Sequence, residues 1–230
     1  MSWIPNQIEN LQCSIHEIAH RAHRNPKDIT LVAVSKAQDI EKIKIARTCG
    51  LVHFGENYVQ EFLKKWPGFN SQPLQWHFIG HLQTNKVKDI VGKVVSIDSV
   101  DRINLIQKIE SECAKIKKTL PVLLQINIGE ETSKSGILPN QFVTFVKALP
   151  PFTFVKIQGL MAIPPQTSDP EHTRSYFKKM FALFCQAKEE FPNFDWRELS
   201  MGMSWDYPIA IEEGATQIRI GSLIFGKRST

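Results

Sequence analysis

The stretch Ile29-Thr30-Leu31-Val32-Ala33-Val34-Ser35-Lys36 is a run of β-branched and aliphatic residues that ends in a lysine. A continuous apolar run of this length is typical of a strand buried on both faces, as in a parallel sheet. A lysine at the tip of such a strand borders apolar surroundings. Desolvation there lowers the pKa of its ammonium and makes the amine available to attack a carbonyl. The alternative is a lysine whose ammonium reaches into water.

Seven more strand-like segments follow, and helical patterns separate them. The eight strands are predicted at residues 29–36, 51–54, 75–79, 93–97, 121–127, 155–161, 197–200 and 216–220. Helices are predicted at 39–49, 56–66, from about 84, 100–117, 139–148, 169–191, 206–212 and from Ser222, with an extra N-terminal helix at 6–23.

Strict alternation of strands and helices implies right-handed crossovers and a parallel sheet. Eight repeats in a chain of 230 residues predict a closed (β/α)₈ TIM barrel near the small end of its size range. An open, doubly wound sheet is the alternative. No linker or shift in composition divides the chain, so residues 1–230 are predicted to form a single domain.

Composition argues against several classes of partner. The net charge is only +5, and the lysine pairs Lys64-Lys65, Lys117-Lys118 and Lys178-Lys179 fall in helical patterns that suggest solvated faces, so nucleic-acid binding is not expected. The four cysteines are far apart in sequence and match no metal or redox motif. With no secretory signal and no long apolar run, a cytoplasmic protein without membrane contact or a metal site is expected, as a monomer.

In a TIM barrel the functional site lies at the C-terminal ends of the strands. Polar and small residues gather at those ends here. The residues at or just beyond those ends include Lys36, Asn57, Ser200, Arg219, Gly221 and Ser222.

The ends of the last two strands suggest an anion site. Gly202 and Gly221 allow close approach of the backbone to a ligand, and Ser222 opens a short helix whose free N–H groups favour a phosphate. Ser200 and Ser204 add hydroxyl groups. The alternative is that the glycines serve only tight turns.

Alternation in the last strand places Gln217 and Arg219 on one face, so Arg219 is predicted to point into the site. A buried arginine stays charged and can only donate hydrogen bonds. The alternative is an ordinary ion pair inside the barrel.

Taken together, the motifs resemble the YggS/PROSC family of pyridoxal 5′-phosphate (PLP) binding proteins, also called PLP homeostasis proteins. The matching stretches cover nearly the whole chain, in the order LVAVSK (31–36), HFGENYVQE (53–61), WHFIGHLQTNK (76–86), NIGEETSKSG (127–136), QGLMAI (158–163), LSMGMSWD (199–206) and IRIGSLIFG (218–226). The resemblance implies a fold like the N-terminal barrel of alanine racemase.

The resemblance also assigns roles to residues. Lys36 matches the lysine that holds PLP as a Schiff base, Asn57 matches an asparagine lining the site, and Arg219 matches the arginine that faces the pyridine nitrogen. Facing an arginine, that nitrogen would stay unprotonated, and the cofactor would be a poor electron sink.

Ser200, Gly221 and Ser222 match phosphate-binding positions of the family. Ser222 departs from the threonine of many relatives but keeps the hydroxyl. Ala37-Gln38 replaces the family's usual Thr-Lys-like pair, which could alter the rim beside the cofactor.

Residues and resemblance together predict a PLP carrier in intracellular PLP homeostasis, with apo PLP-dependent enzymes as possible acceptors and no turnover of its own. A PLP-dependent amino-acid racemase is the alternative, but racemisation needs an acid/base on each face of the carbanion. Alanine racemases take the second group, a tyrosine, from an additional domain that this chain lacks the length to hold. A lysine aldolase acting on a phosphorylated sugar is a third possibility.

Overall fold

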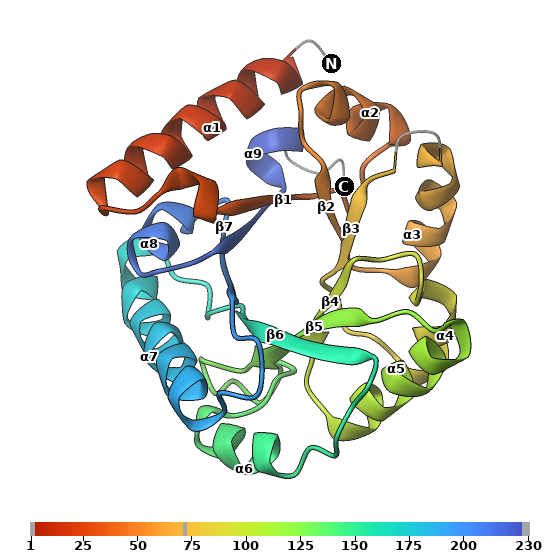
Figure 1. The fold of residues 1–230 in the computed structure, drawn as a ribbon. Coiled ribbons are helices and arrows are strands. Elements are labelled where there is room, and N and C mark those ends of the chain that lie inside the picture. The colour runs from red at the N-terminus through yellow and green to blue at the C-terminus, as the bar shows by residue number, and fades with distance from the viewer. Residues whose placement is uncertain (1–2, 71–72, 227–230) are drawn as a thin grey trace.

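The structure is a computed structural model that describes residues 3–70 and 73–226, and its centre is a closed barrel of eight parallel strands (Figure 1). Each strand pairs with the next, and β1 closes the barrel against β8. The strands are β1 (Thr30–Val34), β2 (His53–Glu56), β3 (Gln75–Phe78), β4 (Ser96–Val100), β5 (Leu120–Ile126), β6 (Val155–Ala162), β7 (Glu198–Met203) and β8 (Gln217–Ile220). The predicted TIM barrel is therefore confirmed.

Helices surround the barrel (Figure 1). They are α1 (Trp3–Arg21), α2 (Ile40–Thr48), α3 (Val59–Lys65), α4 (Val87–Ile90), α5 (Ile103–Ile116), α6 (Phe142–Lys147), α7 (Arg174–Glu190), α8 (Tyr207–Glu212) and α9 (Ser222–Phe225). Short 3₁₀ turns are η1 (Pro26–Asp28), η2 (Trp66–Phe69), η3 (Thr84–Lys86), η4 (Pro139–Gln141) and η5 (Pro170–Thr173). Within the described ranges, no helix is long and apolar enough to cross a bilayer.

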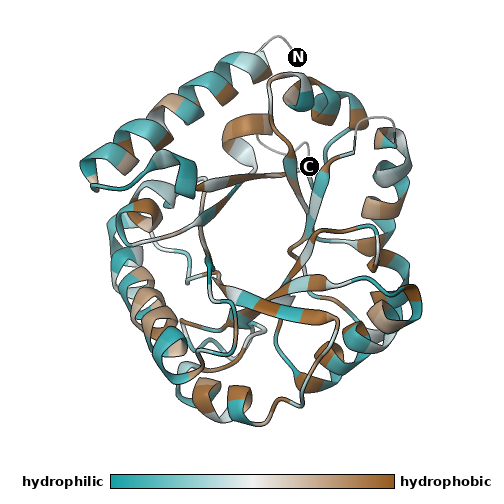
Figure 2. Ribbon diagram, in the orientation of Figure 1, coloured by the Kyte–Doolittle hydropathy of each residue, from teal (hydrophilic) through white to brown (hydrophobic). Residues whose placement is uncertain are grey.

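The predicted extra N-terminal helix is α1, which packs on α2, α8 and α9. Its buried face repeats at helical spacing through Ile4, Ile8, Leu11 and Ile15. Like the other helices, it carries both hydrophobic and hydrophilic segments (Figure 2). Its packing covers the outer side of the barrel beside the short helices α8 and α9.

The apolar core lies between the strands and the helices, where outward-facing strand residues such as Phe54, Trp76 and Leu160 are fully buried. The inside of the barrel is different in kind. Asp98 and Gln217 lie there, buried and hydrogen-bonded to each other. Because strand side chains alternate between faces, one set of residues builds the apolar layer and the other builds an interior that holds these polar groups beside apolar residues such as Val32 and Met161.

Two strand boundaries differ from the prediction in ways that matter for the site. β1 ends at Val34, so Lys36 lies in the turn beyond the strand rather than at its tip. β4 spans Ser96–Val100 instead of 93–97. The inward positions Ser96 and Asp98 of β4 are polar and gave no strand signal. The prediction therefore followed the apolar pair Val94-Val95 and began the strand too early.

Candidate functional site

A cavity of about 700 Å³ lies at the C-terminal ends of the strands, a size suited to a small-molecule ligand. Residues that follow different strands meet on its walls, because the C-terminal ends of parallel strands in a barrel share one rim. The lining includes five of the six predicted site residues: Lys36, Asn57, Arg219, Gly221 and Ser222. The sixth, Ser200, lies outside the lining and contacts Arg219.

Lys36 is half-buried on the cavity wall, two residues beyond the end of β1. Val34 and Gln38 line the same cavity, while the intervening Ser35 and Ala37 do not. Ala37 has a φ of +57°, a left-handed conformation that side chains with a Cβ rarely adopt. The backbone therefore turns sharply just after Lys36, and alternate residues of the turn face the cavity.

Asn57 follows β2, and its position depends on the loop after β3. A Cβ on Gly80 would lie only 2.1 Å from the backbone oxygen of Asn57, so only glycine permits this close approach. The side-chain Oδ1 of Asn57 is buried and has no hydrogen-bond partner among the described residues. A buried acceptor without a partner is costly, while other atoms of Asn57 line the cavity.

Arg219 points inward from β8, as the alternation of that strand predicts, and its guanidinium is buried. Nη1 donates to the Ser200 Oγ at 2.7 Å, and Nη2 donates to the Ala162 carbonyl at 2.8 Å. Burial lowers the pKa of Arg219 to about 10, against the opposing effect of Asp98 and Asp206, so the group stays charged at neutral pH. Its direct partners are neutral oxygens, which differs from the ion pair considered above.

The Arg219 guanidinium is one end of a chain of hydrogen bonds through the barrel, called here the interior network. Its members are His53, His77, Ser96, Asp98, Gln217, Ser200 and Arg219.

The links around Asp98 have defined donors. Gln217 Nε2 donates to Asp98 Oδ2 at 2.8 Å, and the Ser96 hydroxyl donates to the other carboxylate oxygen. Because that hydroxyl has one proton, His77 Nδ1, 2.8 Å away, must donate to it. His77 Nε2 and His53 Nδ1 lie 2.9 Å apart and share a hydrogen bond, whose direction is set by the protonation of the two rings.

The charges of the interior network follow from these bonds. Burial alone would raise the pKa of Asp98, but the nearby His77, whose Nδ1 lies 3.7 Å from Oδ2, and hydrogen bonds from Ser96 and Gln217 bring it below the ordinary value, so Asp98 is a carboxylate. Burial, together with the neighbouring His77, lowers the pKa of His53 to about 4. His53 is therefore neutral at pH 7, and Asp98 is one of the two buried acidic residues, with Asp206, that favour the charge of Arg219.

The two predicted glycines differ in what they do. Gly202 has a φ of +91°, and a Cβ there would lie 2.5 Å from the Ala210 Cβ, so the local turn and packing explain it. Gly221 has a φ of −115°, and its Cβ would meet nothing closer than the Val34 oxygen at 3.4 Å. The protein itself does not require glycine at 221, and this residue lines the cavity with Ser222 at the start of α9.

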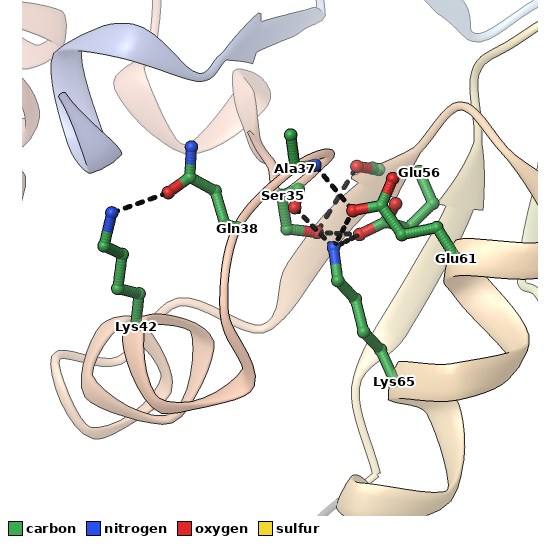
Figure 3. Close-up of polar contacts among 8 residues, drawn as sticks. Ser35, Ala37, Gln38, Lys42, Glu56, Glu61 and Lys65 are labelled. Carbon is green, nitrogen blue, oxygen red and sulfur yellow. Dashed lines mark hydrogen bonds and ion pairs between the residues drawn. The ribbon is translucent and has the colours of Figure 1, made fainter. Parts of the chain in front are cut away.

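A second hydrogen-bonded group includes the two residues that flank Lys36 and is called here the Lys65 cluster: Ser35, Ala37, Glu56, Glu61 and Lys65 (Figure 3). The lysine pair 64–65 was expected to be solvated, and this is wrong for Lys65, whose side chain is only 6% exposed. Glu56 was expected in a helix, but it ends β2 and is buried. Helical periodicity alone gives no sign of this cluster.

Comparison with known proteins shows which family has this sequence and fold. Residues 8–229 match the family described as the alanine racemase N-terminal domain. The pyridoxal phosphate homeostasis protein of Aquifex aeolicus strain VF5 is 44% identical over 214 residues, covering 93% of each chain. That of Escherichia coli K12 is 36% identical over 231 residues, covering 99% of this chain and 98% of the relative.

This chain belongs to the pyridoxal phosphate homeostasis protein family. A solved structure of PipY from Synechococcus elongatus PCC7942, described as having PLP bound, is 31% identical, has a TM-score of 0.85, and matches 97% of this chain and 100% of its own. An alanine racemase of Clostridium difficile 630 is only 16% identical, with a TM-score of 0.73, and this chain spans 57% of it. That second likeness concerns the fold alone.

Proposed function

We propose that this protein binds PLP in the cavity, covalently through the amine of Lys36, and acts in PLP homeostasis by holding and delivering the cofactor. The observation that carries the proposal is the meeting of Lys36, Arg219 and the Gly221-Ser222 backbone on one cavity wall. Support comes from relatives named pyridoxal phosphate homeostasis protein and from the PipY structure described with PLP bound.

The residues present fit such a cofactor. PLP supplies an aldehyde that a lysine amine can hold, a ring with an acceptor nitrogen, and a phosphate. Arg219 can only donate, so it suits the ring nitrogen, and Asn57 lines the same cavity. Gly221 and Ser222 offer backbone N–H groups and a hydroxyl to the phosphate. Ser200 acts through Arg219, because its hydroxyl accepts from that guanidinium.

The tyrosines bear on whether the protein turns over a substrate. The chain has three, and none is among the described residues that line the cavity. Tyr207 hydrogen-bonds Ser14 on α1 at 2.9 Å, and Tyr58 is 62% exposed. The second acid/base that a racemase needs is therefore not supplied by a tyrosine in the cavity. We infer a carrier rather than an enzyme.

Carrier, racemase and aldolase are separated by two measurements on one sample. A carrier loaded with PLP is yellow and leaves the common L-amino acids unchanged during prolonged incubation, as followed by chiral chromatography. Steady racemisation at an enzyme-like rate, lost in Lys36→Ala, would establish the racemase instead. A protein that stays colourless with PLP but reacts covalently with a phosphorylated sugar would be an aldolase.

The setting of this activity is part of the proposal. All four cysteines are free thiols, which suits the reducing cytoplasm. We propose that the chain acts as a single domain and as a monomer, delivering PLP to apo PLP-dependent enzymes. Light scattering of the loaded protein tests the monomer, and the gain of activity by an apo-enzyme mixed with it tests delivery.

A further inference from the structure

Lys65 is buried, and each of the three N–H groups of its ammonium donates a hydrogen bond. Its Nζ donates to the Ser35 carbonyl at 2.6 Å, to Glu56 Oε1 at 2.8 Å and to Glu61 Oε1 at 2.5 Å. An ammonium has three N–H donors, so the three acceptors satisfy it completely. Such complete pairing is what makes a lysine tolerable at this burial.

The contacts of the cluster fall on both sides of Lys36. The Ser35 hydroxyl donates to Glu56 Oε1 at 2.6 Å, and the Ser35 carbonyl accepts from Lys65. On the other side, the Ala37 N–H donates to Glu61 Oε1 at 2.5 Å. The residues before and after Lys36 are thus tied to the same pair of elements, β2 and α3 (Figure 3).

The direction of these contacts follows the alternation of the turn. Val34, Lys36 and Gln38 line the cavity, while Ser35 and Ala37 are bound to the cluster. Ala37 also adopts its left-handed conformation at the point where Glu61 accepts its N–H. A left-handed alanine costs about 1 kcal/mol and persists only where its surroundings hold it.

We propose that Lys65 is a positioning residue for Lys36: together with Glu56 and Glu61 it grips the peptide on either side of Lys36 and so directs that side chain into the cavity. This inference rests on the proposed function, because the group being positioned is the amine that binds PLP. The cluster sets the placement of Lys36 through its neighbours' backbone. Small displacements of a reacting group lower reaction rates strongly, so loosening the grip slows the uptake of PLP.

The residues of the cluster differ in exposure, so an exposed member can be substituted without unfolding the protein. The side chain of Glu56 is 1% exposed and that of Glu61 is 26% exposed. Burial also raises the pKa of Glu56, against the opposing effect of Lys65, so removing Lys65 leaves a buried acid without its partner. Substitution of Glu61 is therefore the first choice for breaking the contacts of the cluster, and substitution of Lys65 is the second.

The experiment compares Glu61→Ala, Glu61→Gln and Lys65→Met, with Lys64→Met as the matched control, since Lys64 is an exposed lysine on the same helix. One readout is the rate at which the visible PLP band grows after PLP is mixed with PLP-free protein. The second is hydrogen exchange at the Ala37 amide in PLP-free protein. The third is the circular dichroism of the PLP band, which reports how the bound ring is oriented and which a change in stability alone would not alter.

Glu61→Ala should speed exchange at Ala37 about tenfold and slow PLP uptake about tenfold, as expected for the loss of hydrogen bonds to a charged group. It should also weaken the dichroism of the band. Glu61→Gln keeps an acceptor oxygen and should stay within about threefold of the parent. Lys65→Met should exceed Glu61→Ala in all three readouts, and Lys64→Met should match the parent.

Parental exchange and uptake in Glu61→Ala would overturn the proposal, as would equal losses in Glu61→Ala and Glu61→Gln. If Lys65→Met does not fold, the two Glu61 variants decide the matter. If the parent takes up no PLP, the proposed function fails, while exchange at Ala37 still shows whether the cluster holds the turn.

Discussion

The interior network and the Lys65 cluster both hold a cationic residue at the cavity, but they hold it differently. The interior network bonds the Arg219 guanidinium itself, through Ser200 and the Ala162 carbonyl. The Lys65 cluster bonds the residues flanking Lys36 and fixes its backbone. The interior network thus acts on the charged group directly, and the Lys65 cluster acts on Lys36 through the backbone of its neighbours.

The two regions also differ in their exposure to water. Asp98 is fully buried and Arg219 is 3% exposed, so each charge depends on the other members of the network. The Lys65 cluster reaches solvent at Glu61. We therefore expect damage to the interior network to reduce stability, and damage to the rim of the Lys65 cluster to reduce reactivity with little loss of stability.

The largest expected effect is that of Asp98→Ala. The substitution leaves Ser96 without its acceptor, takes one of two acceptors from Gln217 and removes one of the two acidic residues that favour the charge of Arg219, which should lower the free energy of unfolding by about 3–5 kcal/mol. Denaturant unfolding measures it, and Asp28→Ala, at an exposed aspartate, should change stability by less than about 0.5 kcal/mol. Equal, small losses in both variants would remove the distinction between the two regions.

Arg219→Ala should have the next largest effect, on the bound cofactor. The variant should still take up PLP on Lys36, but with affinity lower by about 1.5–3 kcal/mol and with a shifted visible absorption band, because the donor facing the ring is lost. Absorption spectra during a PLP titration measure both quantities. Arg197→Ala, at an exposed arginine, is the control, and an unshifted band in Arg219→Ala would place this residue away from the ring.

His53 gives the interior network a pH dependence. Its pKa is lowered to about 4 in the folded protein, while the unfolded chain has the ordinary value near 6.5, so the unfolded chain takes up a proton first as the pH falls. Stability from this residue is present above pH 6.5 and is lost between about pH 6.5 and 4. Since His53 is only half-buried, we expect a loss of about 1–2 kcal/mol.

In His53→Gln this part of the acid sensitivity should vanish, so unfolding measured at pH 7 and pH 4.5 should differ less than in the parent. His16→Gln, at an exposed histidine on α1, should keep the parental pH dependence. If both variants behave like the parent, His53 is not the group responsible.

The smallest effect is expected at Ala37. Ala37→Gly relieves the left-handed conformation but adds freedom to the unfolded chain, so the two terms nearly cancel and stability should change by less than about 0.5 kcal/mol. PLP uptake should stay within about twofold of the parent if the bond from the residue-37 N–H to Glu61 holds the turn. A glycine variant with tenfold slower uptake would show that alanine itself supports the turn.

Much of the fold is visible in the sequence because it rests on local patterns. Buried strands such as Leu31–Val34 alternate with helical periodicity, and that alternation leads directly to a barrel. The inward direction of Arg219 follows from the two-residue period of β8, which also places Gln217 beside it. Both kinds of signal need only neighbouring residues.

What the sequence does not reveal depends on contacts between distant residues. The β4 prediction ended at residue 97 because Asp98 looks like a loop residue until Gln217 on β8 supplies its partner. Lys65 reads as a solvated helical lysine until Glu56 and the Ser35 carbonyl are placed beside it. The burial of a polar residue cannot be predicted from its own sequence position, because it depends on a hydrogen-bond partner that is distant in the sequence.

The most direct test of the central claim is the position of covalent PLP. The parent protein is loaded with PLP, reduced with borohydride, digested and analysed by peptide mass spectrometry, with Lys36→Ala treated in parallel. We expect one modified residue, Lys36, at close to one PLP per chain, and no modified peptide in Lys36→Ala. Label on another lysine of the parent, or undiminished label in Lys36→Ala, would contradict the assignment of this cavity as the PLP site.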